Sequence, residues 1–263
     1  MMGAEDIGWG NLAAGYVLLF VPLLIFRYYR TGMIRSTLVS MARMSVQLLL
    51  VALYLEVIFR LNNPWLNTGW VTVMILATAW TVIGRVRLSP RYLFVPVFLA
   101  VLFSLTAVDA YLLGAVLRLN FIFDARYFIP ITGMLIGNSL TAVIVSFDSF
   151  FGSLTRQQTT YRFGLANGAT RQESLRIFNR EAIRRAMNPT IASTAVMGLV
   201  SLPGMMTGQI LGGSDPSVAI KYQILIMISI FVSTLLSLVI SLNLCSRFVF
   251  DRFDNLKSSV FRR

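Results

Sequence analysis

The sequence RFGLANGATRQESLRIFNREAIRRAMNP, residues 162–189, is polar and basic, and it separates two long apolar segments. The second apolar segment is itself interrupted by SLPGMMTGQ, residues 201–209. Apolar segments of about 20 residues are long enough to cross a bilayer core as helices. A charged amphipathic segment in water between two such spans has few uses other than contact with a soluble partner. The sequence therefore predicts an all-α polytopic membrane protein organised around residues 162–222.

The composition places the chain among membrane proteins. Hydrophobic residues make up 56% of its 263 residues and the mean hydropathy is +0.72, values outside the range of soluble domains. The absence of histidine argues against a zinc or haem enzyme, and the lone Cys245 excludes an internal disulfide. The net charge of +12 is distributed between the apolar segments and not along one soluble face, so no nucleic-acid partner is expected.

About seven transmembrane helices are predicted, in a single transmembrane domain over residues 1–263. They cover residues 9–26, 38–59, 65–84, 92–115, 127–151, 190–211 and 219–245. Most of the 23 Lys and Arg residues fall in segments 27–37, 85–91, 152–189 and 246–263, and only Arg60, Arg118, Arg126 and Lys221 lie on the opposite side. Since positive residues are retained in the cytoplasm, the N-terminus is predicted outside and the C-terminus inside. Residues 152–189 then form a cytoplasmic region between spans five and six.

Residues 170–189 have the pattern of an amphipathic helix with a defined start. Thr170 followed by Glu173 matches a capping box, and Asn167-Gly168 suits the end of an earlier short helix. From Arg171 onward, apolar residues recur every three or four positions and arginines occupy the remaining surface. Asn188-Pro189 is expected to end this helix.

The residues alone leave three interpretations of this helix open. It could lie on the anionic inner leaflet as a basic amphipathic helix. It could be an ordinary loop. It could also be a rigid element that docks into the groove of a partner protein.

The apolar segment after residue 190 contains Pro203, Gly204 and Gly208. An interior proline destabilises a soluble helix by about 3 kcal/mol, and backbone groups freed in a membrane must be buried in protein or face a watery cavity. We therefore expect a kink that acts as a hinge or a site, with close packing of small residues as the competing interpretation. Met205 and Gln209 are candidate path residues there. The amide oxygen of Gln209 suits a hard cation, whereas a thioether suits Cu(I) better than iron, and methionine is also a frequent core residue.

Polar side chains within the spans are candidates for a transport path. Asn138, Thr141 and Asp148 form one stripe on the fifth span, since their spacing returns to the same helix face. Asp109 and Glu56 are further carboxylates at membrane depth, where ionisable groups normally face a bundle interior or an aqueous path. All three carboxylates lie toward span ends, so contact with lipid headgroups competes with this interpretation. No metal site is assigned from these residues.

Two other features are given structural interpretations. Serines recur every four residues in the last span, at positions 229, 233, 237 and 241, and small residues at this spacing favour close helix packing over substrate contact. The tail after residue 246 mixes positive and negative residues. It is expected to be a solvated cytoplasmic end.

The pattern Gly-Ala-Thr at 168–170, followed by Glu173 and by Asn-Pro-Thr-Ile at 188–191, resembles the cytoplasmic EAA-type loop of ABC-transporter permeases. Arg162-Phe163-Gly164 departs from it where those permeases carry an acidic residue. The run GLVSLPGMMTGQILGG at 198–213, with residues 215–224, is similar to the FetB-type (UPF0014) permease family of bacterial iron exporters and to the plant aluminium-sensitivity membrane proteins. This resemblance covers essentially the whole chain.

The resemblance implies a permease subunit in the cell's inner (plasma) membrane, driven by a separate ABC ATPase that binds ATP and Mg²⁺. It implies two permease copies in lipid, and export with iron as the leading substrate. The residues implied to couple to the ATPase are Gly168, Ala169, Thr170, Arg171, Glu173, Leu175 and Phe178. No P-loop motif occurs in the sequence, so the chain is not expected to bind ATP or another cofactor, or to act as an enzyme by itself.

Other functions remain as alternatives. An ATP-independent secondary carrier could use Asp148, Asp109 or Glu56 as proton relays, but it would not need a long structured inner segment. ABC export of a nucleotide-sugar-like polar solute is the alternative to a metal substrate, since the plant relatives are linked to nucleotide-sugar transport. A membrane enzyme acting on a lipid-linked sugar ranks last, because the sequence lacks a convincing acid–base pair.

Overall fold

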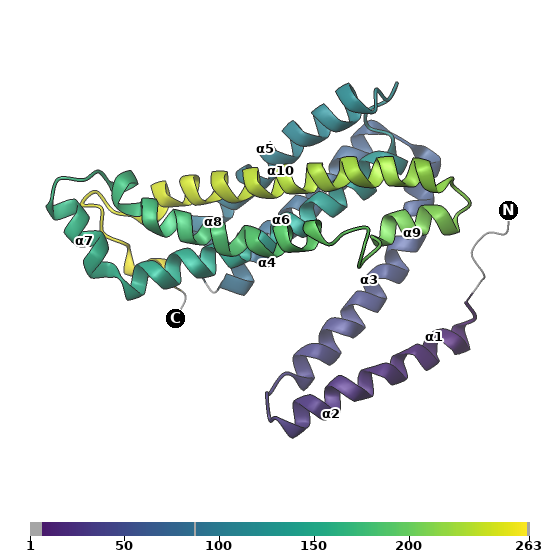
Figure 1. Ribbon diagram of the computed structural model, residues 1–263, viewed down its shortest axis with the longest axis horizontal. Coiled ribbons are helices and arrows are strands. Elements are labelled where there is room, and N and C mark those ends of the chain that lie inside the picture. The colour runs from purple at the N-terminus through teal and green to yellow at the C-terminus, as the bar shows by residue number, and fades with distance from the viewer. Residues whose placement is uncertain (1–6, 87, 262–263) are drawn as a thin grey trace.

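The computed structural model describes residues 7–86 and 88–261, and every element in that part is helical (Figure 1). In chain order these are α1 (Trp9–Gly15), η1 (Tyr16–Leu19), α2 (Phe20–Tyr28), α3 (Ile34–Leu61), α4 (Pro64–Val86), α5 (Pro90–Asp109), the π-helical η2 (Ala110–Val116), α6 (Ala125–Arg156), α7 (Gln158–Ala166), α8 (Arg171–Ala195), α9 (Gly204–Leu211), α10 (Pro216–Val249) and η3 (Ser258–Val260). The predicted all-α class is thus confirmed. Arg87, Arg262 and Arg263, which belong to the segments assigned to the inside, lie outside the described residues.

Six of the seven predicted spans are confirmed as helices. Within the described residues, the helices long and apolar enough to cross a membrane are Trp9–Tyr28, Ile34–Leu61, Pro64–Val86, Pro90–Val116, Ala125–Arg156 and Pro216–Val249. The predicted span at 190–211 differs. It consists of the end of α8, an unwound stretch from Val196 to Pro203, and α9.

The expectation that Asn188-Pro189 ends the inner helix is wrong, because α8 continues through Pro189 to Ala195. A proline inside a helix removes one backbone hydrogen bond and leaves the turns on either side intact. In an apolar environment those turns are strongly favoured, since an extended chain would leave many backbone groups unpaired.

The core of the bundle is formed by α4, α5, α6 and α10. α10 packs along α5 and α6, and α4 packs along the same two helices. Ser229, Ser233, Ser237 and Ser241 of α10 are all buried, and the Ser237 hydroxyl contacts that of Ser104 on α5. Their small side chains let the helices approach closely, in agreement with the predicted packing role.

α6 and α10 run in the same direction. Near their first turns the rings of Tyr127 and Tyr222 stack with centroids 6.4 Å apart. Just past their last turns, Tyr161 lies 5.6 Å from Phe250, again measured between ring centroids. The chain between the two helices must therefore return along the bundle, and Figure 1 shows α8 and α9 following this course beside α10.

The first three helices form an arm that diverges from the bundle (Figure 1). None of the apolar window in Trp9–Tyr28 is buried, and only 6% of that in α3 is. The arm meets the bundle near the end of α3, where Ile58 packs with Ala125 and Ile129 of α6. Such exposure is as expected for helices covered by lipid or by another chain.

The expectation of a solvated C-terminal tail is wrong. Phe250 and Val260 are buried, and the Ser89 amide donates a 2.8 Å hydrogen bond to the carbonyl of Val260. The ring of Phe261 lies 6.3 Å from that of Phe151 on α6, centroid to centroid. The prediction rested on the charged residues of the tail. Its apolar residues Phe250, Val260 and Phe261 nevertheless pack against the bundle.

Substitutions at Ser233 can test whether the serine stripe serves close helix packing or provides polar contacts. It is fully buried, and its hydroxyl has no hydrogen-bond partner among the residues described. We expect Ser233→Ala to keep or slightly raise the Tm of the detergent-purified protein, because it removes an unsatisfied polar atom. Ser233→Leu should cost about 1–3 kcal/mol by overpacking. Equal destabilisation by both changes would contradict the packing role.

Candidate functional site

α7 and α8 form a helix pair at one end of the bundle, joined by residues 167–170 (Figure 1). Gly168 has a φ of +86°, a left-handed conformation that glycine adopts without strain. The amides of Gly168 and Ala169 donate to the carbonyls of Leu165 and Gly164, at 3.0 and 3.1 Å. These bonds satisfy carbonyls at the end of α7, so the turn is closely defined.

The predicted capping box at the start of α8 is confirmed. The Glu173 carboxylate accepts hydrogen bonds from the Thr170 amide at 2.8 Å and the Thr170 hydroxyl at 2.7 Å, and the Glu173 amide donates to that hydroxyl at 3.3 Å. The hydrogen bond from the Thr170 side chain, followed by that from its backbone, lowers the pKa of Glu173. Glu173 is therefore ionised at neutral pH and stabilises the first turn of α8.

α7 and α8 lie close together at Gly164. A Cβ atom at this position would lie 2.9 Å from the Ser174 hydroxyl oxygen and 3.4 Å from the Ser174 Cβ. Ser174 is buried, and its hydroxyl has no hydrogen-bond partner among the described residues. Gly164 belongs to the segment Arg162-Phe163-Gly164, which lacks the acidic residue of the EAA-type loop. The close contact between α7 and α8 requires a glycine at this position.

The two faces of the helix pair differ in what they contact. Leu175 and Phe178, which the resemblance assigned to the coupling surface, are each only 2% exposed and pack in the core. They hold α8 in place and cannot contact a partner directly. Phe163 and Ile177 are instead 70% and 58% exposed. Neither residue was among the predicted coupling residues, although both fall outside the apolar stripe of the pair, a position that predicts exposure.

The C-terminal tail fixes the helix pair to the bundle. Tyr161 on α7 donates a 2.8 Å hydrogen bond to the carbonyl of Asp254, and Arg171 on α8 forms a 3.1 Å ion pair with the Asp254 carboxylate. Burial, with a smaller contribution from the Asp254 charge, raises the pKa of Tyr161 to about 12, so its hydroxyl stays a donor. The Arg171 guanidinium also lies 5.8 Å from the ring centroid of Phe250.

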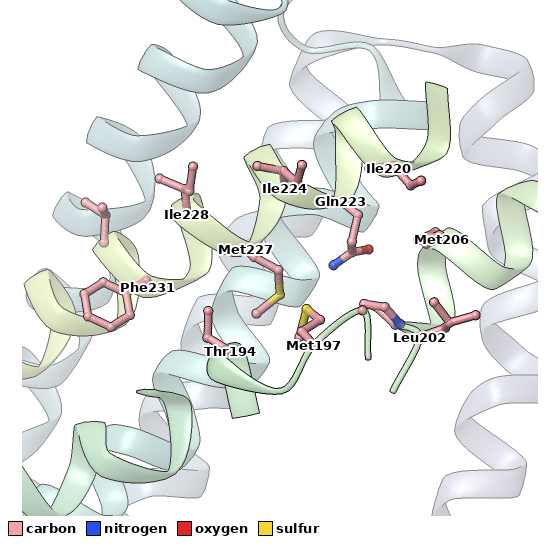
Figure 2. A pocket seen from close by; sticks show the side chains of 13 residues that line it. Thr194, Met197, Leu202, Met206, Ile220, Gln223, Ile224, Met227, Ile228 and Phe231 are labelled. Carbon is pink, nitrogen blue, oxygen red and sulfur yellow. The ribbon is translucent and has the colours of Figure 1, made fainter. Parts of the chain in front are cut away.

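The unwound stretch opens a cavity of about 570 Å³. Its walls come from the end of α8, the stretch itself, α9 and the first half of α10. Figure 2 shows the thioethers of Met197 and Met227 and the amide of Gln223 directed toward the same space. The Gln223 amide oxygen is buried and has no hydrogen-bond partner within the described chain. The cavity is therefore mostly apolar, with soft sulfur atoms and one unsatisfied amide acceptor.

The helix predicted at 190–211 is interrupted earlier in the chain than expected, at Val196–Pro203. Pro203 was expected inside a kinked helix, but it precedes α9, whose first residue is Gly204 and which contains Gly208. The turn occurs instead at Gly198, with a φ of +88°, and the Gly198 amide donates to the Ser201 carbonyl at 3.0 Å. Gly198 adopts this conformation readily, whereas a residue with a Cβ would be strained there.

The predicted path residues do not form one cluster. Asn138, Thr141 and Asp148 are exposed on α6, as one face of that helix. Asn138 and Thr141 donate back to carbonyls of their own helix, at 2.9 and 3.3 Å. The stripe is therefore an outer surface of the single chain at membrane depth.

The remaining candidates lie elsewhere. Asp109 is buried between α5 and α6, where it accepts a 2.8 Å hydrogen bond from Thr132. Glu56 is exposed on the arm, and Met205 packs against the core. Gln209 is half-buried on α9, and its carbonyl accepts from the Ser214 amide at 2.9 Å.

Gly164 offers a double-mutant test of the helix contact. Gly164→Ala should destabilise the pair by about 1–3 kcal/mol through overpacking against Ser174. Adding Ser174→Ala removes the hydroxyl nearest to the new Cβ, so the double variant should recover most of this loss. Limited proteolysis of the α7–α8 turn, together with thermal unfolding, measures both effects. Strictly additive losses would show that the two residues are not in contact.

Comparison with known proteins identifies the family. The chain matches the family described as "Uncharacterised protein family (UPF0014)" over residues 9–250. "Probable iron export permease protein FetB" of Escherichia coli is 32% identical over 248 residues, covering 94% of this chain and 93% of that protein. "Protein ALUMINUM SENSITIVE 3" of Arabidopsis thaliana is 32% identical over 254 residues, with coverages of 95% and 90%.

A second bacterial relative is similar over most of the chain. "UPF0014 membrane protein YjkA" of Bacillus subtilis is 31% identical over 231 residues, covering 88% of this chain and 90% of that protein. No solved structure matches the chain significantly. The relatives and the six apolar helices make it a multi-pass protein of the inner (plasma) membrane. The chain therefore belongs to the UPF0014 family of membrane proteins.

Proposed function

We propose that this chain is the permease subunit of an ABC transporter that exports iron or another metal cation, driven by a separate ATPase subunit. The observation that carries the proposal is the fixed inner helix pair, which exposes Phe163 and Ile177. A metal cargo and an outward direction follow from the name of the FetB relative. ATP and Mg²⁺ would bind to the partner, and ATP hydrolysis would occur there.

The helix pair is suited to transmit force. Its turn is defined by hydrogen bonds, the start of α8 is capped, and the tail ties both helices to the bundle. A large exposed aromatic side chain on a fixed helix is the usual anchor of a helix-in-groove contact. Movement of the partner would be carried along α8, which leads directly to the unwound stretch at Val196–Pro203.

The unwound segment would complete a seventh crossing. Since α6 and α10 run in the same direction, the chain between them has to return, and the end of α8, the unwound stretch and α9 provide that return. An odd number of crossings puts the termini on opposite sides. The excess of Lys and Arg in segments such as 152–189 then favours an outside N-terminus and an inside C-terminus.

Two copies of the permease would enclose the path. Asn138, Thr141 and Asp148 are exposed on α6, and Arg43 is exposed on α3 of the arm. Charged and polar side chains at membrane depth are costly against lipid. A second copy that covers these surfaces would remove the cost and would place the polar stripe along a shared path.

The secondary carrier remains the alternative because of Asp109. A buried carboxyl group hydrogen-bonded to a neighbouring helix, as Asp109 is to Thr132, resembles the relay groups of proton-coupled carriers. Transport by this chain alone in vesicles without ATP would favour the carrier and reject the ABC assignment.

Phe163 provides the test of coupling. Coexpressed with an ABC-type ATPase of the same organism, Phe163→Ala should weaken co-purification by tenfold or more, as about 2 kcal/mol is typical of a central aromatic anchor. Glu173→Ala should weaken it less, by loosening the first turn of α8. Phe253→Ala is the matched control, because Phe253 is 83% exposed but lies on the tail. Unchanged co-purification of the first two variants would reject this surface.

Asp148 provides the test of the path. ATP-dependent uptake of Fe²⁺ into inside-out vesicles should fall about tenfold or more in Asp148→Asn, because the variant removes the only charge of the stripe. Asp109→Asn is the comparison, since its amide oxygen can still accept the hydrogen bond from Thr132. Wild-type uptake by Asp148→Asn, or an equal loss in both variants, would remove Asp148 from the path.

A further inference from the structure

A basic groove of about 430 Å³ lies between the end of α6 and the side of α8. Four arginines line it, namely Arg156, Arg180, Arg184 and Arg185, with Glu181 as the one acidic residue. All four arginines are exposed. The groove is on the flank of the helix pair. Ile177 of the proposed partner surface also lines it, whereas the helix turn and Phe163 do not contribute to it.

The charge of the groove is only partly neutralised. Arg185 forms an ion pair with Glu181 at 2.6 Å. Within residues 7–86 and 88–261, no ion pair involves Arg156, Arg180 or Arg184. Three exposed guanidinium groups around one concave surface attract an anion, and guanidinium binds phosphate with paired, charge-assisted hydrogen bonds.

The position of the groove along the bundle matches the lipid headgroup layer. Arg156 is five residues beyond the end of the apolar segment at 151, which corresponds to about 8 Å of helix. Arg184 and Arg185 precede the apolar segment starting at 190 by a similar distance of about 8–9 Å. The polar layer on each side of the hydrocarbon core is about 5–8 Å thick. The long side chains of Arg156 and Arg184 therefore reach headgroup level, and Arg180, about one helical turn further from the bilayer, lines the same groove.

From these observations we propose that the groove binds a phosphate group, supplied by the headgroup of an anionic phospholipid of the inner leaflet. Arg180, Arg184 and Arg156 contact the phosphate, and Arg185 stays paired with Glu181. The flank of α8 is thereby fixed to the membrane surface, while Phe163 and the turn between α7 and α8 remain free for a protein partner. Free phosphate offers the same chemistry, so the experiment separates the two sources.

The test compares anions and arginines on the full-length chain in detergent. The protein is titrated with short-chain phosphatidylglycerol, with short-chain phosphatidylcholine, or with inorganic phosphate, and affinity is taken from the rise in Tm. Wild-type protein should bind phosphatidylglycerol at least about tenfold more tightly than phosphatidylcholine. The variant Arg180→Gln/Arg184→Gln should lose this preference, since both side chains are exposed and their removal leaves the core intact.

Arg176→Gln is the matched control, because Arg176 is an exposed arginine of the same helix that does not line the groove. It should keep wild-type affinity. A response to inorganic phosphate with the same dependence on Arg180 and Arg184, and no preference for phosphatidylglycerol, would support a site for free phosphate. The proposal is overturned if neither anion distinguishes wild type from the double variant, or if the double variant loses only binding of an ATPase.

Discussion

Burial of one face of α8 against the bundle determines where the pair of helices α7 and α8 points. Leu175 and Phe178 are almost fully enclosed, and each such side chain contributes about 1.5–3 kcal/mol when it is removed from water. The contact of Gly164 with Ser174 then sets the position of α7 on α8. With the tail bound to both helices, the pair forms part of the bundle and is not a loose connection.

The membrane segments follow a different constraint, because lipid cannot hydrogen-bond to the backbone. α8 continues through Pro189 to Ala195, and the unwound chain is restricted to the short stretch Val196–Pro203. There the chain turns at Gly198 and lines a cavity, while Leu199 is 93% exposed. The proposed seventh crossing places this exposed, irregular segment at membrane depth, where it would require cover from another chain or from a moving part of this one. The same need applies to the polar stripe of α6.

Sequence periodicity predicted those features that depend on local chemistry. The apolar segments, the serine stripe of α10 and the capping box of Thr170 and Glu173 all follow from spacing and side-chain type. Features that depend on tertiary contact were not predicted. Leu175 and Phe178 were assigned to the coupling surface although their apolar periodicity indicates burial. Pro189 was taken as a stop because the residue before a proline disfavours helix, yet α8 continues past it to Ala195. The packing of the tail on α6 depends on residues about a hundred positions away, which no local pattern reveals.

Hydrogen–deuterium exchange over residues 158–178, with and without an ABC ATPase, is the most direct test of the proposal that the α7–α8 pair is fixed and receives force from a partner. We predict slow exchange in the first turns of α8 already in the free protein, because the capping box and the buried face hold them. Binding of the ATPase should add protection centred on Phe163 and Ile177. Rapid exchange in the first turns of α8 with and without the ATPase would contradict the account. Protection by the ATPase that is confined to other parts of the chain would contradict it as well.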